Sequence, residues 1–78
     1  MNQILYTDGT TEEFLGEPSL SEKQGMVGGY IEHVTLPDGK LLIVNEDGLI
    51  HGLPKNEQAS IIANRPIVGT AILITPIQ

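Results

Sequence analysis

Apolar and polar residues alternate most regularly in the middle of the chain. The run YIEHVTL, residues 30–36, alternates across a pleat, and KLLIVN, residues 40–45, returns after Pro37-Asp38-Gly39. Proline fixes its own φ and glycine readily takes a positive φ, so the turn chemistry agrees with the strand pattern and predicts a β-hairpin. The stretch LLIV is apolar at both alternations. It predicts a central strand covered on both faces, or a strand at an oligomer contact.

The N-terminal part predicts a second hairpin. NQILY, residues 2–6, is typical of a short strand, and Asp8-Gly9 is a tight-turn dipeptide. The segment TEEFL, residues 11–15, would then be the returning strand.

A short helix is predicted after Pro18. Ser19 is a candidate N-cap, and Glu22 three residues later completes a capping box. Gly28-Gly29 would end the helix after about two turns, because glycine accepts the left-handed conformation found at helix ends.

The C-terminal third predicts a turn, a helix and a strand. NEDG, residues 45–48, makes the turn, and LIHGL, residues 49–53, could form a brief strand. We predict a helix over residues 55–63 with Asn56 as its N-cap. The β-branched segment that follows predicts a strand over residues 67–74.

The element order predicts an α+β domain, in which a small mixed or mostly antiparallel sheet of hairpins carries two short helices. Two short helices can cover one face of the sheet only partly, and Ile and Leu side chains also belong to the opposite face. The sequence therefore allows two further possibilities, closure of the sheet into a barrel-like structure and assembly into a homo-oligomer.

The size and charge of the chain limit the functions that it can have. The 78 residues allow one domain, residues 1–78, with a core that buries about 60% of the unfolded surface. Its aromatic residues are one Phe and two Tyr, too few for a platform that stacks nucleic-acid bases. The net charge of -6 repels phosphate backbones, so generic nucleic-acid binding is not expected.

The absence of cysteine excludes a disulfide framework and a thiolate metal site, so cytoplasmic residence is the default expectation. The N-terminus lacks a basic segment followed by a long apolar one, and no window approaches 18 apolar residues in a row. We therefore expect no membrane segment.

The turn NEDG resembles the middle of a calcium-binding EF-hand loop. With Gly48 at the glycine position of that loop, Asp47 and Asn45 take ligand positions. Ile43 then replaces the first carboxylate and Pro54 the bidentate glutamate, so the register fails. We predict no metal site and interpret the segment as a turn.

No residue set matches a catalytic signature. His33 and His51 are the only imidazoles, and each is either a solvated residue or a ligand contact. Gly28 and Gly29 follow a helix and lack the lysine of a phosphate loop, so they either end that helix or offer bare amides to an anion. Arg65, the one guanidinium, either pairs with a carboxylate or holds an anion. We therefore expect no enzyme and no cofactor.

Four motifs in a fixed order, GGYIEHV, LPDGKLLIVNEDGL, GLPKNEQA and IVGTAIL, resemble a family of short uncharacterised proteins carried by phages, plasmids and other bacterial mobile elements. The resemblance covers residues 25–74. It implies a setting in which small acidic proteins occupy a host regulator, a defence protein or a signalling nucleotide. The positions that match are Gly29, Tyr30, Ile31, Glu32, Asn45, Glu46, Gly48, Leu53, Pro54, Asn56, Ala59, Val68 and Gly69.

Our leading hypothesis is a non-enzymatic phage-type protein, in the host cytoplasm, that forms a homo-oligomer and sequesters a nucleotide-derived ligand. The candidate ligand-binding residues are Gly28, Gly29, Tyr30, His33, Asn45, Asn56 and Arg65.

The alternative hypothesis is an acidic module that binds and inhibits a host enzyme or regulator. A ligand-binding protein should show a pocket lined by Tyr30, Asn45 and Asn56. An interaction module should instead show an exposed patch of glutamates, made by Glu12, Glu13, Glu17 and Glu22.

Overall fold

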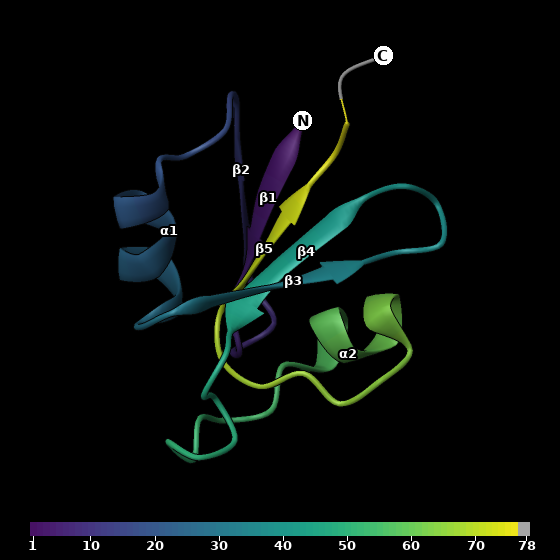
Figure 1. Ribbon diagram of the computed structural model, residues 1–78. Helices are drawn as coiled ribbons and strands as arrows, with labels where there is room; N and C mark the ends of the chain where they lie inside the picture. Colours follow the sequence, from purple (N-terminus) through teal and green to yellow (C-terminus); the bar gives the residue numbers. More distant parts are fainter. Residues whose placement is uncertain (77–78) are drawn as a thin grey trace.

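The computed structural model describes residues 1–76 and shows one five-stranded sheet with two short helices (Figure 1). This arrangement confirms the α+β prediction. The elements in chain order are β1 (Asn2–Leu5), β2 (Thr11–Phe14), α1 (Leu20–Val27), β3 (Ile31–Thr35), β4 (Leu41–Asn45), α2 (Glu57–Ala63) and β5 (Ala71–Ile74).

The strands lie in the order β2-β1-β5-β4-β3, and all four neighbouring pairs are antiparallel. The C-terminal strand β5 lies in the centre and joins the two hairpins. The sheet is open, with β2 and β3 as its edge strands. The alternative of barrel-like closure is therefore wrong, because closure requires the two edge strands to pair.

The same type of turn closes both hairpins. Its glycine has a positive φ, 91° at Gly9 and 88° at Gly39, which a side chain would disfavour. The aspartate before each glycine accepts a hydrogen bond from the backbone N–H two residues later, at 2.9 Å for Asp8 and 3.0 Å for Asp38. Local Asp-Gly chemistry thus determines both hairpins, as the sequence predicts.

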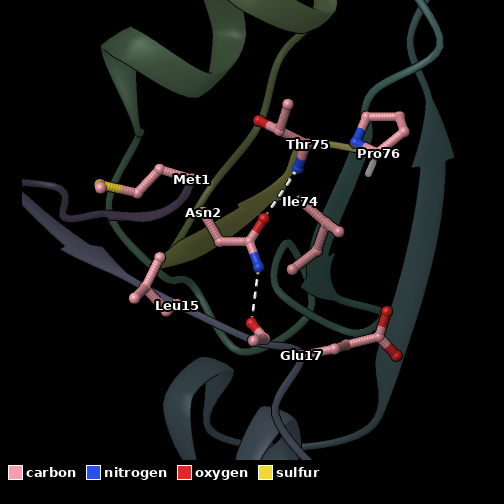
Figure 2. Close-up of a pocket in the computed structure, with 8 residues that line it drawn as sticks. Met1, Asn2, Leu15, Glu17, Ile74, Thr75 and Pro76 are labelled. Carbon is pink, nitrogen blue, oxygen red and sulfur yellow. Dashed lines mark hydrogen bonds between the residues drawn. The ribbon is translucent and has the colours of Figure 1, made fainter. Parts of the chain in front are cut away.

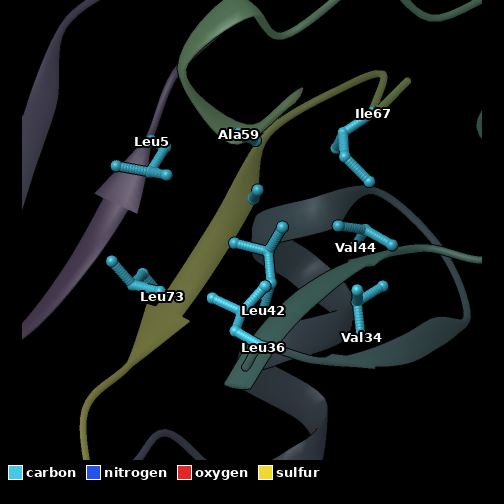
Figure 3. Packing of buried hydrophobic residues seen from close by; sticks show 9 residues of the cluster. Leu5, Val34, Leu36, Leu42, Val44, Ala59, Ile67 and Leu73 are labelled. Carbon is cyan, nitrogen blue, oxygen red and sulfur yellow. The ribbon is translucent and has the colours of Figure 1, made fainter. Parts of the chain in front are cut away.

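The larger core cluster lies between the sheet and α2 (Figure 3). Leu42 and Val44 of β4 pack there with Ala59 of α2, the one buried residue of that helix. The other members of the cluster are Leu5, Val34, Leu36, Ile67, Ala71 and Leu73.

The smaller cluster lies on the opposite face, beneath α1. Ile43 and Ile72 are fully buried there against Val27 of the helix. Strand β4 is consequently covered on both faces, which confirms the prediction of a central strand. The expectation that both helices share one face is wrong, because successive side chains of a strand point to opposite faces and both faces are apolar.

The boundaries of α1 follow the predicted capping signals. Ser19 accepts a hydrogen bond from the N–H of Glu22, and the Glu22 carboxylate accepts one from the N–H of Ser19. Gly28 ends the helix with a φ of 83°.

Two predicted elements differ in the C-terminal third. Residues 49–53 form turns in place of a strand. The strand predicted over residues 67–74 begins only at Ala71, since Val68 makes an isolated bridge with Lys55 and Gly69 takes a φ of 79°. A positive φ is incompatible with a regular strand.

Candidate functional site

Asn45 lies at the end of β4, where the sequence analysis placed a ligand contact. Its side chain is buried, with 6% of the residue exposed. Its Nδ2 donates to the carbonyl of Val27 at 3.0 Å, and its Oδ1 accepts from the N–H of Asp47 at 2.8 Å. Asn45 thereby ties the end of α1 to the turn after β4. The amide serves the backbone of this chain.

Asn56 is still more deeply enclosed, with none of its surface exposed. Its Nδ2 donates to the carbonyls of Leu5 and Gly69, both at 2.9 Å, and its Oδ1 caps α2 by accepting from the N–H of Ala59 at 3.1 Å. Both amide hydrogens are therefore used, and Asn56 joins three segments. The predicted contact with a ligand is not compatible with this geometry, because no face of the amide reaches solvent.

Between these two asparagines the chain makes a single helical turn. The N–H of Leu53 bonds to the carbonyl of Gly48 at 3.0 Å, and that of Gly52 to the carbonyl of Leu49 at 3.1 Å, which is the pattern of a Schellman motif. Gly52 has the positive φ that this motif requires, 66°. The turn leaves Leu49 and Ile50 exposed, at 77% and 83%. We call residues 44–56 the corner.

Two predicted contacts, Gly29 and Tyr30, do come together. They line an open hollow of about 460 Å³ with Gln24, Asp47 and His51. Tyr30 is largely exposed. We call this the Tyr30 hollow. Its charged group is the carboxylate of Asp47, which disfavours a phosphate.

The remaining predicted contacts do not line this hollow. Gly28 ends α1, and His33 is exposed on the edge strand β3. Arg65 pairs with Glu32 at 3.3 Å, so its geometry favours structural pairing. That ion pair borders a smaller hollow of about 220 Å³, which Asn45 also lines.

A third buried asparagine, which the sequence analysis missed, holds the N-terminus. Asn2 lines a hollow of about 430 Å³ (Figure 2), and its Nδ2 donates to the carbonyl of Gly16 at 2.6 Å. Its Oδ1 accepts from the N–H of Thr75 at 2.9 Å. The sequence does carry a signal for this role, because Asn2 is a polar residue at the start of an apolar strand. Like the other two, this amide connects segments distant in sequence.

The net charge is concentrated at one end of the sequence. Residues 1–22 hold five carboxylates and neither Lys nor Arg, whereas residues 23–78 hold five carboxylates and all four cations. Five of the six net negative charges therefore come from the first 22 residues. The structure places these residues in the β1–β2 hairpin and the start of α1.

Each Lys and Arg side chain of the described residues already has a carboxylate within 4 Å. Only one of these pairs, Lys23 with Glu17 at 3.1 Å, involves the first 22 residues. Within residues 1–76, Glu12, Glu13 and Glu22 have no salt-bridge partner. The other three pairs are Lys40–Asp38, Lys55–Glu57 and Arg65–Glu32.

A groove runs between β2 and α1. Phe14 and Met26 contribute apolar surface to it, and the carboxylate-bearing residues Glu12, Glu17 and Glu22 also line its volume of about 380 Å³. We call this the β2–α1 groove. It combines an apolar surface with three acidic residues.

Local hydrogen bonds shift the pKa values of three groups in the N-terminal hairpin and the first turn of α1. A hydrogen bond from the Thr10 hydroxyl lowers the pKa of Asp8, and the Ser19 N–H lowers the pKa of Glu22. The Tyr6 hydroxyl donates to Glu12 at 3.1 Å, which raises the pKa of Tyr6. Asp8 and Glu22 therefore stay ionised at neutral pH.

A family model described as "Domain of unknown function (DUF3846)" matches residues 1–77. The chain belongs to the DUF3846 family. The match includes the first two dozen residues, which lay outside the resemblance seen in the sequence, and so includes the acidic hairpin. No curated protein and no solved structure matches the chain.

Several positions that carried the family resemblance explain the packing of this DUF3846 chain. A β-carbon on Gly29 would lie 3.0 Å from Nδ2 of Asn45. One on Gly48 would lie 2.7 Å from Val68. A β-carbon at Gly48 would require Val68 to shift, and one at Gly29 would require the Asn45 amide to give by a few tenths of an ångström, so glycine suits the close packing at both positions.

Neither a cluster of metal-ligating side chains nor a helix able to cross a membrane is found in the part of the chain that the structure describes. Within residues 1–76, no three His, Asp or Glu side chains come together as metal ligands would. Over the same residues, neither helix has the length and apolar character needed to cross a bilayer.

Proposed function

We propose that this protein is a non-enzymatic interaction module whose acidic face docks on a basic surface of a partner protein. The acidic face is the exposed group Glu12, Glu13, Glu17 and Glu22 around β2, in which Glu12, Glu17 and Glu22 lie on the side of the β2–α1 groove and Glu13 on the other side of the strand. The observation that carries the proposal is the concentration of five of the six net charges in the first 22 residues.

Electrostatics explains why this asymmetry matters. An excess of carboxylates over cations around β2 and the start of α1 produces a field that extends over about 8 Å at physiological salt, enough to orient a basic partner before contact. Such complementarity mainly raises the association rate and excludes wrong partners. The balanced charges of residues 23–78 produce no comparable field.

The resemblance to proteins of phages and other mobile elements supports a biological setting. In that setting the chain is made in a host cytoplasm, and the partner is a host enzyme or regulator that the module inhibits. The buried amides of Asn45 and Asn56 also favour this proposal over a ligand pocket, because the expected pocket needs both side chains.

The test compares two variants of equal net charge in affinity capture from a bacterial lysate. The face variant carries Glu12→Gln, Glu13→Gln and Glu17→Gln. The remote variant carries Glu46→Gln, Asp47→Asn and Glu57→Gln.

A protein that the parent and the remote variant capture, and that the face variant loses, is the expected result. Its association with the parent should also weaken steeply with salt. Equal capture by both variants would show that the acidic face is not the docking surface, and would overturn the proposal.

Ligand sequestration remains a second candidate because of the Tyr30 hollow. An exposed aromatic ring beside about 460 Å³ of open volume is able to stack on a base. Calorimetry with cyclic dinucleotides, cyclic trinucleotides and ADP-ribose derivatives should then give heat that Tyr30→Ala abolishes. No heat from any of them would exclude this candidate.

The homo-oligomer stays a prediction. With each face of the sheet covered by a helix, the surfaces left for self-association are the exposed apolar side chains and the strand edges. Light scattering at micromolar concentration tests it, and a strict monomer would contradict it.

A further inference from the structure

Strand β2 forms one open edge of the sheet. It pairs only with β1, as the strand order shows (Figure 1). The N–H of Tyr6 bonds to the carbonyl of Thr10 at 2.9 Å. Because bonded and non-bonded pairs alternate along an antiparallel ladder, the N–H and C=O groups of Thr11 and Glu13 point away from β1. These backbone groups could pair with a further strand.

The charges of β2 determine which charge an added strand should carry. Glu12 and Glu13 are adjacent in the strand, so their side chains point to opposite faces of the sheet. Both faces beside the edge are therefore acidic. An acidic strand, including β2 of a second copy, would be repelled on both faces, whereas a strand carrying Lys or Arg would be attracted.

The β2–α1 groove provides the apolar part of the surface. Phe14, at the end of β2, is half-buried on the smaller core cluster, and Met26 of α1 lies beside the same groove. A strand added to β2 would place alternate side chains over this groove. An apolar side chain there would contact Phe14, and cations two residues away, on the same face of the added strand, would meet Glu12, Glu17 and Glu22.

The other edge strand lacks this combination. On β3 the one carboxylate, Glu32, is already paired with Arg65 at 3.3 Å. His33 is exposed on the same strand. Charge complementarity therefore distinguishes β2 from β3 as the edge for a basic partner.

We propose that an extended, basic segment of the partner adds to β2 as a sixth strand. It pairs with the outward backbone groups of Thr11 and Glu13, packs an apolar side chain on Phe14 and directs cations to the carboxylates of the acidic face. This inference rests on the proposed function, because it names the part of the partner that the acidic face receives.

The experiment uses a blocked ten-residue peptide that repeats Lys-Lys-Val-Val, so that an extended strand carries both Lys and Val on each face, titrated into ¹⁵N-labelled protein. Amide shifts should concentrate in residues 11–14 and around the groove, and the amides of Thr11 and Glu13 should gain protection from hydrogen exchange. The Glu12→Gln, Glu13→Gln variant should bind about tenfold more weakly or worse, while a Glu46→Gln, Asp47→Asn variant should bind like the parent.

A second peptide separates strand addition from simple charge attraction. It has the same side chains and charge, but its central five residues are N-methylated and cannot donate backbone hydrogen bonds. We expect it to bind about tenfold more weakly or worse, since the backbone pairing supplies the affinity.

Three outcomes overturn the inference: equal binding of the N-methylated peptide, shifts centred on β3 in place of β2, or no binding of the parent peptide at millimolar concentration. Equal binding that still depends on Glu12 and Glu13 leaves the proposed function standing and rejects only the strand. Equal capture of a lysate protein by the face variant and the remote variant rejects the proposed function itself.

Discussion

The corner at residues 44–56 and strand β2 of the N-terminal hairpin, residues 11–14, use polar residues for opposite purposes. In the corner, Asn45 and Asn56 turn inward and bond to backbone, while Leu49 and Ile50 face solvent. In the hairpin, Glu12 and Glu13 face solvent without a cation among the described residues. The corner uses its two buried amides to close the fold, whereas β2 leaves two carboxylates on the surface without a cation.

This difference follows from what each side chain can satisfy. A neutral amide can be buried at little cost if each hydrogen and the oxygen find a partner, and Asn56 meets that condition. An ionised glutamate is costly to bury without a cation, so it remains on the surface. The motif-rich corner is consequently structural, and the plain segment TEEF carries the unbalanced charge.

Asn56→Ala should have the largest effect. It removes a helix cap and leaves the buried carbonyls of Leu5 and Gly69 without a donor, which together should lower the free energy of unfolding by about 3 kcal/mol or more. A 78-residue domain has a free energy of unfolding of roughly 4–12 kcal/mol, so this loss is a large part of the total. Urea denaturation followed by circular dichroism measures the loss.

The matched control is Asn64→Gly. Asn64 already has a φ of 54°, which glycine adopts freely, so stability should hold or rise slightly. Asn56→Asp adds a further comparison, because it keeps the cap acceptor but faces the two carbonyls with oxygen; it should be as damaging as Asn56→Ala. A loss below about 1 kcal/mol for Asn56→Ala would contradict the structural role of the corner.

Gly48→Ala tests the closure of the corner at a smaller scale. The new β-carbon would lie 2.7 Å from Cγ2 of Val68 and 3.4 Å from the carbonyl of Asn45, so we expect a loss of about 1–3 kcal/mol. Gly25→Ala is the control, since its β-carbon meets nothing within 4 Å and alanine favours the helix by about 0.5–1 kcal/mol. Thermal melts should therefore shift in opposite directions for the two variants. Parallel shifts would contradict the close packing at Gly48.

The sequence predicts the local parts of the fold well. The two Asp-Gly turns, the capping box of Ser19 and Glu22 and the cap by Asn56 each depend on neighbouring residues, and all are present. The placement of the helices on opposite faces depends on the pairing of β5 with both β1 and β4, which is a long-range contact. No local pattern encodes it.

The candidate site was harder to predict for a related reason. Asn45 has the residue type and neighbours of a ligand contact, but its partner, the carbonyl of Val27, lies 18 residues away. The role of a buried amide is set by such distant partners. The acidic face, by contrast, follows from counting charges along the chain, so the alternative hypothesis could name its residues in advance.

Charge reversal in β2 tests whether Glu12 and Glu13 are dispensable for folding, in contrast to the asparagines of the corner. Glu12→Lys with Glu13→Lys should change the free energy of unfolding by less than about 1 kcal/mol, because both side chains are exposed. The same variant should lose binding of the Lys-Val peptide. Denaturation and NMR titration on one sample measure both effects. Unfolding of this variant would mean that the hairpin, like the corner, has a structural role.

Glu22→Gln should have the smallest effect, visible only as a change with pH. The pKa of Glu22 is lowered below its ordinary value of 4.5 by the hydrogen bond from the Ser19 N–H, so ionised Glu22 stabilises the fold above pH 4.5. That contribution is lost as the pH falls through the lower pKa of the folded state. Glutamine keeps an oxygen for the capping bond but does not titrate. Melting temperatures between pH 6 and pH 3 should therefore fall less steeply for Glu22→Gln than for the parent. Identical slopes would mean that the capping carboxylate gains nothing from its charge, and that this part of the acidic face is held by geometry alone.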